Sequence, residues 1–189
     1  MERALTLHPD SRSAAVDGIA VEAVRAAGGS LGLRYAVRGR VEGVRWPPLG
    51  APERADGLWR RTCFEAFVRV PGSSVYFEFN FAPSTEWAAY RFSGYREGAA
   101  DIAEDELEAP QIVAGRGEDG FSLRAGLTLT GVPELAGDAA WELALSAVIE
   151  EADGSISHWA LAHPAGVHDF HHADGFALSL PVPELAGIS

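Results

Sequence analysis

The sequence contains no lysine, a single cysteine and a single methionine, so all of its basic residues are arginine. Without lysine, the chain has no Schiff-base or lysine-nucleophile chemistry. With Cys63 alone, an intramolecular disulfide is impossible, which fits a reducing compartment. No apolar run reaches the ~18 residues that indicate a membrane-spanning helix, so no membrane partner is expected. The first residues also lack the apolar segment of a secretory signal, and we therefore expect a cytoplasmic protein.

Positive charge is scarce as well, because 15 basic residues face 27 acidic ones and give a net charge of −12. Nucleic-acid phosphates require a basic surface, so a nucleic-acid partner is excluded. A hydrophobic content of 47% is ample for a core in a chain of 189 residues. We expect one domain that covers residues 1–189.

The motifs of common enzyme classes are absent. There is no GxSxG elbow, no phosphate-binding P-loop, no GxGxxG after a strand and no recognisable catalytic triad. Glu65 and Glu78 lie on neighbouring predicted strands and imitate the carboxylate pair of a glycosidase, a chemistry that depends on the distance between the two groups. The sequence does not fix that distance, and we predict that the protein is not an enzyme.

Alternation of apolar and polar residues dominates the chain and predicts strands with one buried face and one wet face. Short strands separated by turn residues are typical of a sandwich or barrel. The expected fold is a single antiparallel β-sandwich of about eleven strands, with jelly-roll or immunoglobulin-like topology. A short helix over 99–108 is also compatible with the pattern. The predicted strands are 31–38, 75–82, 121–130 and 141–150, with weaker candidates at 3–8, 19–26, 62–70, 86–93, 111–116, 155–162 and 175–181.

The hairpin 62–82 divides its side chains between two faces. The phenylalanines at 64, 77, 79 and 81 share the face predicted to be buried, which leaves Glu65 beside Phe67, and Asn80 beside Glu78, on the other face. A carboxylate next to an aromatic ring is a plausible polar anchor for a ligand in an apolar groove. The alternative is an ordinary ion pair across the strands, such as Glu78 with Arg69.

Eleven of the 18 aromatic residues lie between Leu58 and Gly98, together with several arginines. Rings such as Trp59, Trp87 and Tyr95 stack on the C–H faces of sugars and tolerate water at their polar edges. Guanidinium groups such as those of Arg91 and Arg96 bind carboxylates or phosphates, or stack on neighbouring rings. The alternative is that the rings simply form the core.

Five of the six histidines lie between 158 and 172. His163, His168, Asp169 and His171 are candidate ligands for zinc or another transition metal, although their spacing matches no common metal motif. The alternative is a polar loop whose side chains satisfy backbone groups. Five acids in the segment 101–108 leave the same choice between a hard-cation site and a solvated loop.

Three motifs together give a family resemblance: LWRRTCFEAFV, YFEFNFAPSTEWAAYRFSGYR and HPAGVHDFHHADGFALSL. They resemble the bacterial DOMON-like domains, which are related to the family 9 carbohydrate-binding modules. The resemblance implies an antiparallel β-sandwich and two ligand classes, sugars and haem. It maps the shared tryptophan and acid-bearing strand onto Trp59 and Glu65, and the adjoining strand onto Glu78 and Asn80. Axial ligation of haem by methionine and histidine is excluded because the only methionine is Met1, so a haem site would need two histidines from 158–172.

We therefore predict a non-catalytic module, without a cofactor, that binds a saccharide or a similar hydroxylated small molecule. One alternative is an electron-transfer domain that binds haem or a divalent metal through His163, His168 or His171. Another is a protein-interaction scaffold without a ligand. The predicted ligand-binding residues are Trp59, Glu65, Asn80, Trp87, Arg91, Tyr95 and Arg96.

Overall fold

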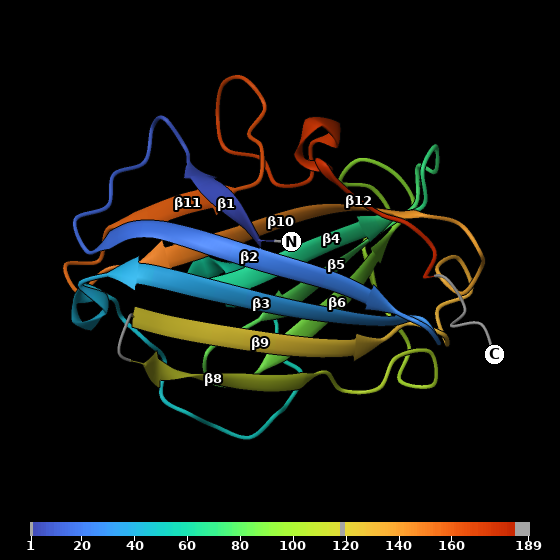
Figure 1. The fold of residues 1–189 in the computed structure, drawn as a ribbon, viewed down its shortest axis with the longest axis horizontal. Helices are drawn as coiled ribbons and strands as arrows, with labels where there is room; N and C mark the ends of the chain where they lie inside the picture. The colour runs from blue at the N-terminus through green and yellow to red at the C-terminus, as the bar shows by residue number, and fades with distance from the viewer. Residues whose placement is uncertain (1, 118–119, 184–189) are drawn as a thin grey trace, which may run out of the picture.

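The computed structural model describes residues 2–117 and 120–183, so the ends of the predicted domain at Met1 and 184–189 lie outside it (Figure 1). Twelve strands and three short 3₁₀ helices occur within these ranges, and the prediction of an antiparallel all-β protein is confirmed. The elements are β1 (Glu2–Leu7), β2 (Val16–Ala26), β3 (Ser30–Gly39), η1 (Val41–Gly43), η2 (Leu58–Arg60), β4 (Cys63–Arg69), β5 (Tyr76–Phe81), β6 (Trp87–Phe92), β7 (Ala100–Asp101), β8 (Gln111–Gly117), β9 (Gly120–Thr128), β10 (Trp141–Glu150), β11 (Ile156–Ala160), η3 (Ala173–Gly175) and β12 (Leu178–Leu180).

The helix considered for 99–108 does not form. The segment begins with the two-residue strand β7 and continues as a turn-rich loop. Ile102 and Leu107 enter the core from this loop, and their spacing of five residues does not place them on one face of a helix. No helix in the described part of the chain has the length and apolar character needed to cross a membrane.

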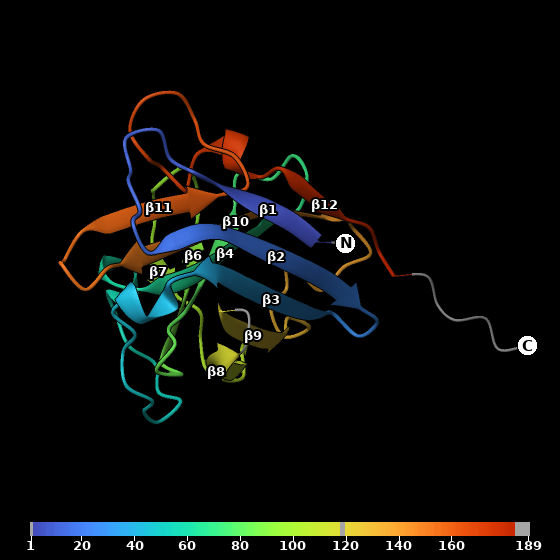
Figure 2. The ribbon, with the colours of Figure 1, turned by 60° about the vertical axis from the view of Figure 1, so that its left-hand side comes forward.

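Hydrogen bonds join the strands into one continuous antiparallel sheet, in the order β7-β6-β5-β4-β10-β11-β1-β2-β3-β9-β8, with β12 beside β10. Strand β1 makes the connection, because Leu5 pairs with Ile19 of β2 while Thr6 pairs with Ala160 of β11. The sheet curls so that its two halves overlie each other (Figures 1 and 2). The expected topology of a two-sheet jelly roll or immunoglobulin-like sandwich is not confirmed, since one path of paired strands runs through both halves.

The core lies between the two halves of the curled sheet. Tyr35 of β3 packs its ring 5.0 Å from that of Phe64 of β4, and its hydroxyl donates a hydrogen bond of 2.7 Å to the carbonyl of Glu65. The alternating apolar residues of β3, β5, β9 and β10 all belong to this core, as predicted. Burial of each phenylalanine in it contributes about 1.5–3 kcal/mol.

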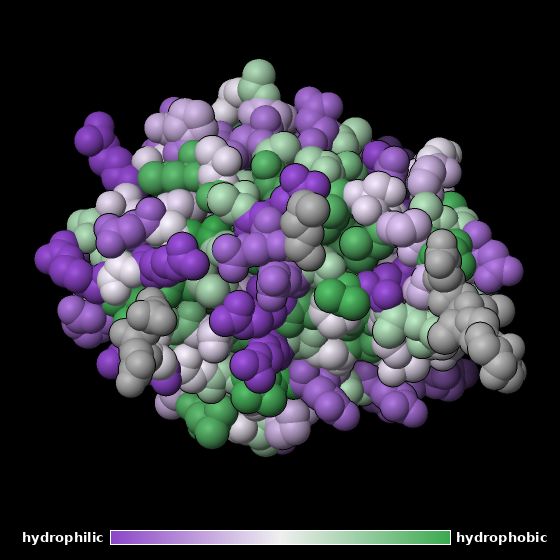
Figure 3. All heavy atoms as spheres, viewed as in Figure 1, coloured by the Kyte–Doolittle hydropathy of each residue, from purple (hydrophilic) through white to green (hydrophobic). Residues whose placement is uncertain are grey.

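The outer faces of the two halves differ. Over β2 and β3, alternate side chains such as Glu22 and Arg34 are partly exposed, and hydrophilic residues gather on this side of the molecule (Figure 3). The prediction of a wet outer face is wrong for the other half, because every residue of β5 is buried. Its outer face forms a second apolar cluster around Phe67, Tyr76 and Phe92, covered by the segment 161–177.

Candidate functional site

A pocket of about 380 Å³ lies on this covered outer face, between the sheet and the segment 161–177. Strands β4 and β5 supply its floor, while η2 and β6 supply one wall. Strand β11 and the segment 161–177 supply the other wall. Strand pairing fixes this arrangement, because residues at alternate positions of β4, β5 and β6 must point to the same side.

Two carboxyl groups form the floor. Glu65 lies opposite Asn80 in the β4–β5 pair and Glu78 lies opposite Phe67, so the two acids are diagonal neighbours on one face. Glu65 is only 2% exposed. Its Oε2 accepts a hydrogen bond of 3.4 Å from Ser146 Oγ, whereas its Oε1 has no hydrogen-bond partner among the described residues. Glu78 Oε1 accepts a hydrogen bond of 2.7 Å from the Asn80 amide.

Burial raises the pKa of Glu65 well above its ordinary value, and the negative charge of Glu78 raises it further. Burial also raises the pKa of Glu78, although the hydrogen bond from Asn80 and the charge of Arg96 partly offset this effect. The cause in both cases is that a carboxylate loses its hydration when it is buried. The pair therefore tends to retain a proton, and the two groups titrate together.

Aromatic rings form the wall nearest β6. The ring of Trp59 is 41% exposed and meets the ring of Tyr90 edge to face at 6.1 Å. The Tyr90 hydroxyl donates a hydrogen bond of 2.6 Å to Asp56, which fixes the ring. Phe92 continues the wall and is stacked on Tyr76 at 4.7 Å. Phe170 faces them from the segment 161–177, so a flat ligand would be enclosed by apolar ring surfaces.

Asp169 attaches the segment 161–177 to the loop after β6. It accepts hydrogen bonds from the Arg96 guanidinium at 2.7 Å, from the Tyr95 hydroxyl and from the backbone N–H of His171 at 3.0 Å. Burial favours a higher pKa for Asp169, but these hydrogen bonds outweigh it and lower the pKa. Asp169 is therefore a carboxylate whose charge is used to hold the loop and to neutralise Arg96.

His171 faces the floor from above. The Tyr76 hydroxyl accepts a hydrogen bond from the backbone N–H of Arg96 and lies 2.8 Å from His171 Nδ1, so its own proton is directed to that nitrogen. Burial, together with the nearby charge of Arg96, lowers the pKa of His171 to about 4. The neutral ring then carries its proton on Nε2, which lies 3.7 Å from Glu78 Oε2.

The other histidines form a separate cluster beside the pocket. The rings of His158 and His168 stack at 3.6 Å, which leaves no space for an iron between them. His163 directs its Nε2 to the carbonyl of Thr6 at 2.8 Å and lies beside His8. Burial and the neighbouring histidines lower the pKa of His158 to about 4, so its ring is neutral near pH 7.

Of the four predicted metal ligands, His168, Asp169 and His171 line the same pocket and His163 does not, and the four do not form a metal site. Three of them already have other partners. His163 contacts a backbone carbonyl, Asp169 binds Arg96, and His171 contacts the hydroxyl of Tyr76. Across the ranges 2–117 and 120–183, no group of three or more histidine, cysteine, aspartate or glutamate residues is placed to hold a metal ion.

Some of the predicted ligand-binding residues meet at the pocket. Trp59, Glu65 and Arg96 line it. Asn80 is fully buried and does not line the pocket, but its amide donates a hydrogen bond to Glu78 on the floor. Tyr95 also lies outside the pocket, and its hydroxyl donates a hydrogen bond to Asp169. His168, Asp169 and His171, which were predicted as metal ligands, also line the pocket.

Trp87 and Arg91 do not belong to the site, which corrects the prediction. They pair with Phe81 and Phe77, whose side chains point into the core, so they lie on the wrong face of β6. Trp87 is 6% exposed and packs in the core, and Arg91 forms ion pairs with Glu106 and Glu134. The face of β6 that reaches the pocket carries Tyr90 and Phe92, and the period of two in this strand could have identified them.

Glu78, His158 and Phe170 are further pocket residues that the predicted ligand-binding set omits. Glu78 was recognisable from its position two residues before Asn80. His158 lies on β11, where pairing with Val148 of β10 places it, and Phe170 reaches the pocket because the segment 161–177 folds back over the sheet, so neither position has a local signal in the sequence.

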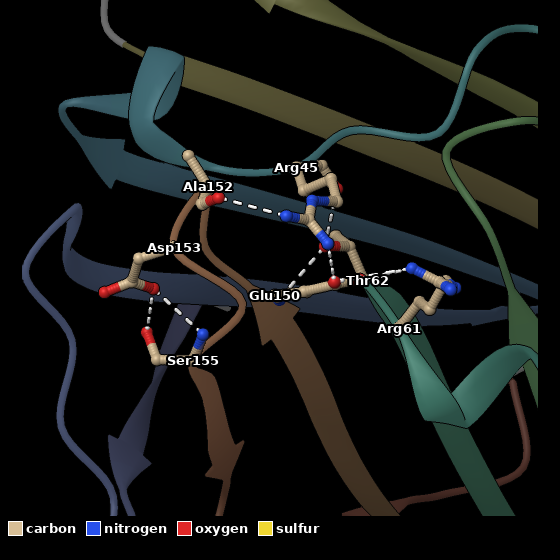
Figure 4. A network of polar contacts seen from close by, with 7 residues as sticks. All are labelled: Arg45, Arg61, Thr62, Glu150, Ala152, Asp153 and Ser155. Carbon is tan, nitrogen blue, oxygen red and sulfur yellow. Dashed lines mark hydrogen bonds and ion pairs between the residues drawn. The ribbon is translucent and has the colours of Figure 1, made fainter.

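A polar network next to the pocket holds the chain that leads into β4 (Figure 4). The buried carboxylate of Glu150 binds the guanidinium groups of Arg45 and Arg61, the latter at 3.1 Å. Thr62 accepts a hydrogen bond from the backbone N–H of Glu150 and donates one to the carbonyl of Arg45. These bonds fix Arg61 and Thr62, which lie between η2 and β4.

No protein-family model matches the chain, and no curated protein matches its sequence. Among solved structures, a Bacteroides uniformis protein proposed to bind carbohydrate is similar, with a TM-score of 0.67 and 14% identity over 93% of this chain and 83% of that one. This similarity shows a shared fold. Two structures of a family 9 carbohydrate-binding module from Caldicellulosiruptor kristjanssonii, in complex with glucose and with cellotriose, are more distant, with TM-scores of 0.46 and 0.48 and identities of 9% and 8%. They cover 83% and 86% of this chain, which matches 72% and 74% of theirs.

Proposed function

We propose that this pocket binds a saccharide or a similar small hydroxylated molecule without converting it. The observation that carries the proposal is the unpartnered Oε1 of Glu65, which is buried on the floor of a pocket with aromatic walls. A buried polar atom without a partner costs about 1–3 kcal/mol, and a ligand hydroxyl placed there would recover it. The volume of about 380 Å³ falls in the range of small-molecule sites.

The arrangement of the walls supports the same class of ligand. The exposed edge and face of Trp59 offer a surface for the C–H groups of a sugar ring, and Tyr90 and Phe92 extend it. The acids beneath supply hydrogen-bonding groups at fixed positions. The neighbouring groups Asp169 and His171 are already engaged in hydrogen bonds that hold the loop, which favours holding a ligand over transforming it.

The shared fold with a protein proposed to bind carbohydrate agrees with this function. A relation to the DOMON-like domains, a single domain of the sandwich type and a cytoplasmic location belong to the same proposal. Each of these rests on sequence features: the three motifs, the length and composition, and the single cysteine.

A calorimetric screen with monosaccharides and short oligosaccharides tests the function. We expect at least one sugar to bind, and the Trp59→Ala variant to weaken its binding about tenfold because a stacking surface is lost. The control is Val113→Ala, which changes an exposed residue of β8 in the other half of the sheet and should leave the affinity unchanged. Absence of binding across the screen, or equal affinity of Trp59→Ala and the parent protein, would overturn the proposal.

A further inference from the structure

The pocket has more acidic than basic groups that are free to bind a ligand. Glu65 and Glu78 are acids that make no ion pair with arginine on the floor, whereas the guanidinium of Arg96 is already bound to Asp169. His158 and His171 are neutral near pH 7, since burial lowers the pKa of each to about 4. Among the described residues that line the pocket, the only arginine is therefore already bound to Asp169, and two carboxyl groups are available to a cationic ligand.

We propose that the ligand carries a protonated amine beside its hydroxyl groups, as an amino sugar does, and that the ammonium group is held by Glu65 and Glu78. This proposal rests on the proposed function and specifies the class of ligand. An ammonium group has three donors, and the floor offers the free Oε1 of Glu65 together with the Oε2 of Glu78. Hydrogen bonds between charged partners are about twice as strong as neutral ones, so the amine gains more than a hydroxyl at the same place.

The walls suit the same ligand. Rings of Trp59, Tyr90 and Phe92 stand around the floor, and their electron-rich faces attract a cation in addition to covering the apolar side of a sugar. The net charge of −12 adds a field that draws cations towards the protein and repels anions.

Proton release follows from this geometry. The free pocket shares a proton between its two acids because burial and mutual repulsion disfavour a double charge. An ammonium ion supplies the missing positive charge, so the pair ionises fully and its proton passes to the buffer. A neutral sugar brings no charge and leaves that proton in place. The titratable groups that face or adjoin the pair are Cys63 on β4, Tyr76 on β5, Tyr90 on β6, His158 on β11, Arg96 after β6, His168, Asp169 and His171 on the covering segment, and Tyr35 across the core.

Matched sugars test the proposal by calorimetry. Glucosamine, galactosamine and mannosamine are each compared with the N-acetyl derivative and the parent hexose, at about pH 6, where the amine is charged. We expect one amino sugar to bind about tenfold or more tightly than both of its neutral counterparts. Titration in two buffers of different ionisation enthalpy should show the release of about one proton with the amine and none with the hexose.

Variants separate the amine site from the sugar site. Glu65→Gln should remove the proton release and the preference for the amine, so that the amino sugar and its parent hexose bind this variant with affinities within about threefold of each other. The control Glu142→Gln changes an acid of β10 that pairs with Arg69 outside the pocket, and it should retain the preference. If Glu65→Gln fails to fold, Glu78→Gln and the proton count of the parent protein provide the same readout.

The outcomes distinguish the two proposals. Equal affinity for an amine and its neutral counterparts, without proton release, would overturn the amine while the sugar-binding function stands. Tighter binding of the N-acetyl derivative would overturn it as well. Failure of every sugar to bind would overturn the proposed function and this inference together.

Discussion

Replacing Glu65 by glutamine should stabilise the protein at alkaline pH. The side chain is 2% exposed, its Oε1 has no hydrogen-bond partner among the described residues, and Glu78 lies diagonally across the strand pair. Glutamine has the same shape and removes the charge, so the cost of desolvating a carboxylate and of repulsion between the two acids disappears. We expect the free energy of unfolding to rise by about 2 kcal/mol at pH 8, which lies within the ~1–3 kcal/mol range for a buried unsatisfied group.

The sign of the pH dependence follows from the raised pKa of Glu65. Below the ordinary value of 4.5, the acid is neutral in both the folded and the unfolded protein, and it costs nothing. As the pH rises, the unfolded state loses its proton first, so folding becomes less favourable until the folded state also ionises. The advantage of Glu65→Gln should therefore be small near pH 4 and reach its full value at pH 8.

Urea denaturation at both pH values measures this difference, and thermal unfolding should show a rise of about 4–8 °C at pH 8. The control Glu142→Gln removes an acid that is ion-paired with Arg69 at 2.8 Å, so it should lose up to about 1 kcal/mol. The reasoning would be refuted if Glu65→Gln had a lower free energy of unfolding than the parent protein, by the same amount at pH 4 and at pH 8. It would mean that the carboxylate of Glu65 is satisfied in the folded protein.

Three further predictions concern the core, the end of β3 and the histidines. Trp87→Ala should lower the free energy of unfolding by about 3–5 kcal/mol, because its ring lies in the core, and urea denaturation measures the loss. Gly39→Ala should cost about 3 kcal/mol, since Gly39 has a φ of 127° and a β-carbon would meet backbone atoms at the start of β2. The control Gly18→Ala has open space and should stay within about 1 kcal/mol in the same assay; equal losses would contradict this account. Between about pH 6.5 and pH 4, His158 and His171 should remove stability on the order of 2 kcal/mol once solvent screening is allowed for, because the unfolded state binds their protons first. Urea denaturation of the Glu65→Gln variant, which lacks the titration of Glu65, measures this loss. A free energy of unfolding that does not change between pH 6.5 and pH 4 would contradict it.

The sequence predicted the local structure well because alternation is a local property. Each predicted strand overlaps an observed strand, and the inward residues of β3, β5, β9 and β10 are those that the pattern indicated. In β6 the same alternation places Trp87 and Arg91 on the face opposite to Tyr90 and Phe92. The strand pairing shows that these two residues point into the core side of the sheet while Tyr90 and Phe92 face the pocket.

The site was only partly predictable. Glu65 and Arg96, which the sequence predicts as ligand-binding residues, line the pocket, whereas the metal centre that was one alternative for the histidines is not assembled by the described residues. Spacing along a loop does not determine where its side chains point. In the structure, Arg96 and Tyr95 donate hydrogen bonds to Asp169, and these bonds hold the segment 161–177 against the pocket.

By itself, the sequence determined that this protein is built from antiparallel strands with a large aromatic core, since a period of two in a sufficiently apolar chain leaves few other arrangements. Only the tertiary structure decided that the sheet curls into one continuous layer and that the outer face of β4, β5 and β6 is covered. The segment 161–177 covers it through contacts with residues some 75–100 positions away, such as Tyr95 and Tyr76. That covering leaves Glu65 and Glu78 only 2% and 6% exposed, and it makes two acids that the sequence places on a wet face the floor of a pocket.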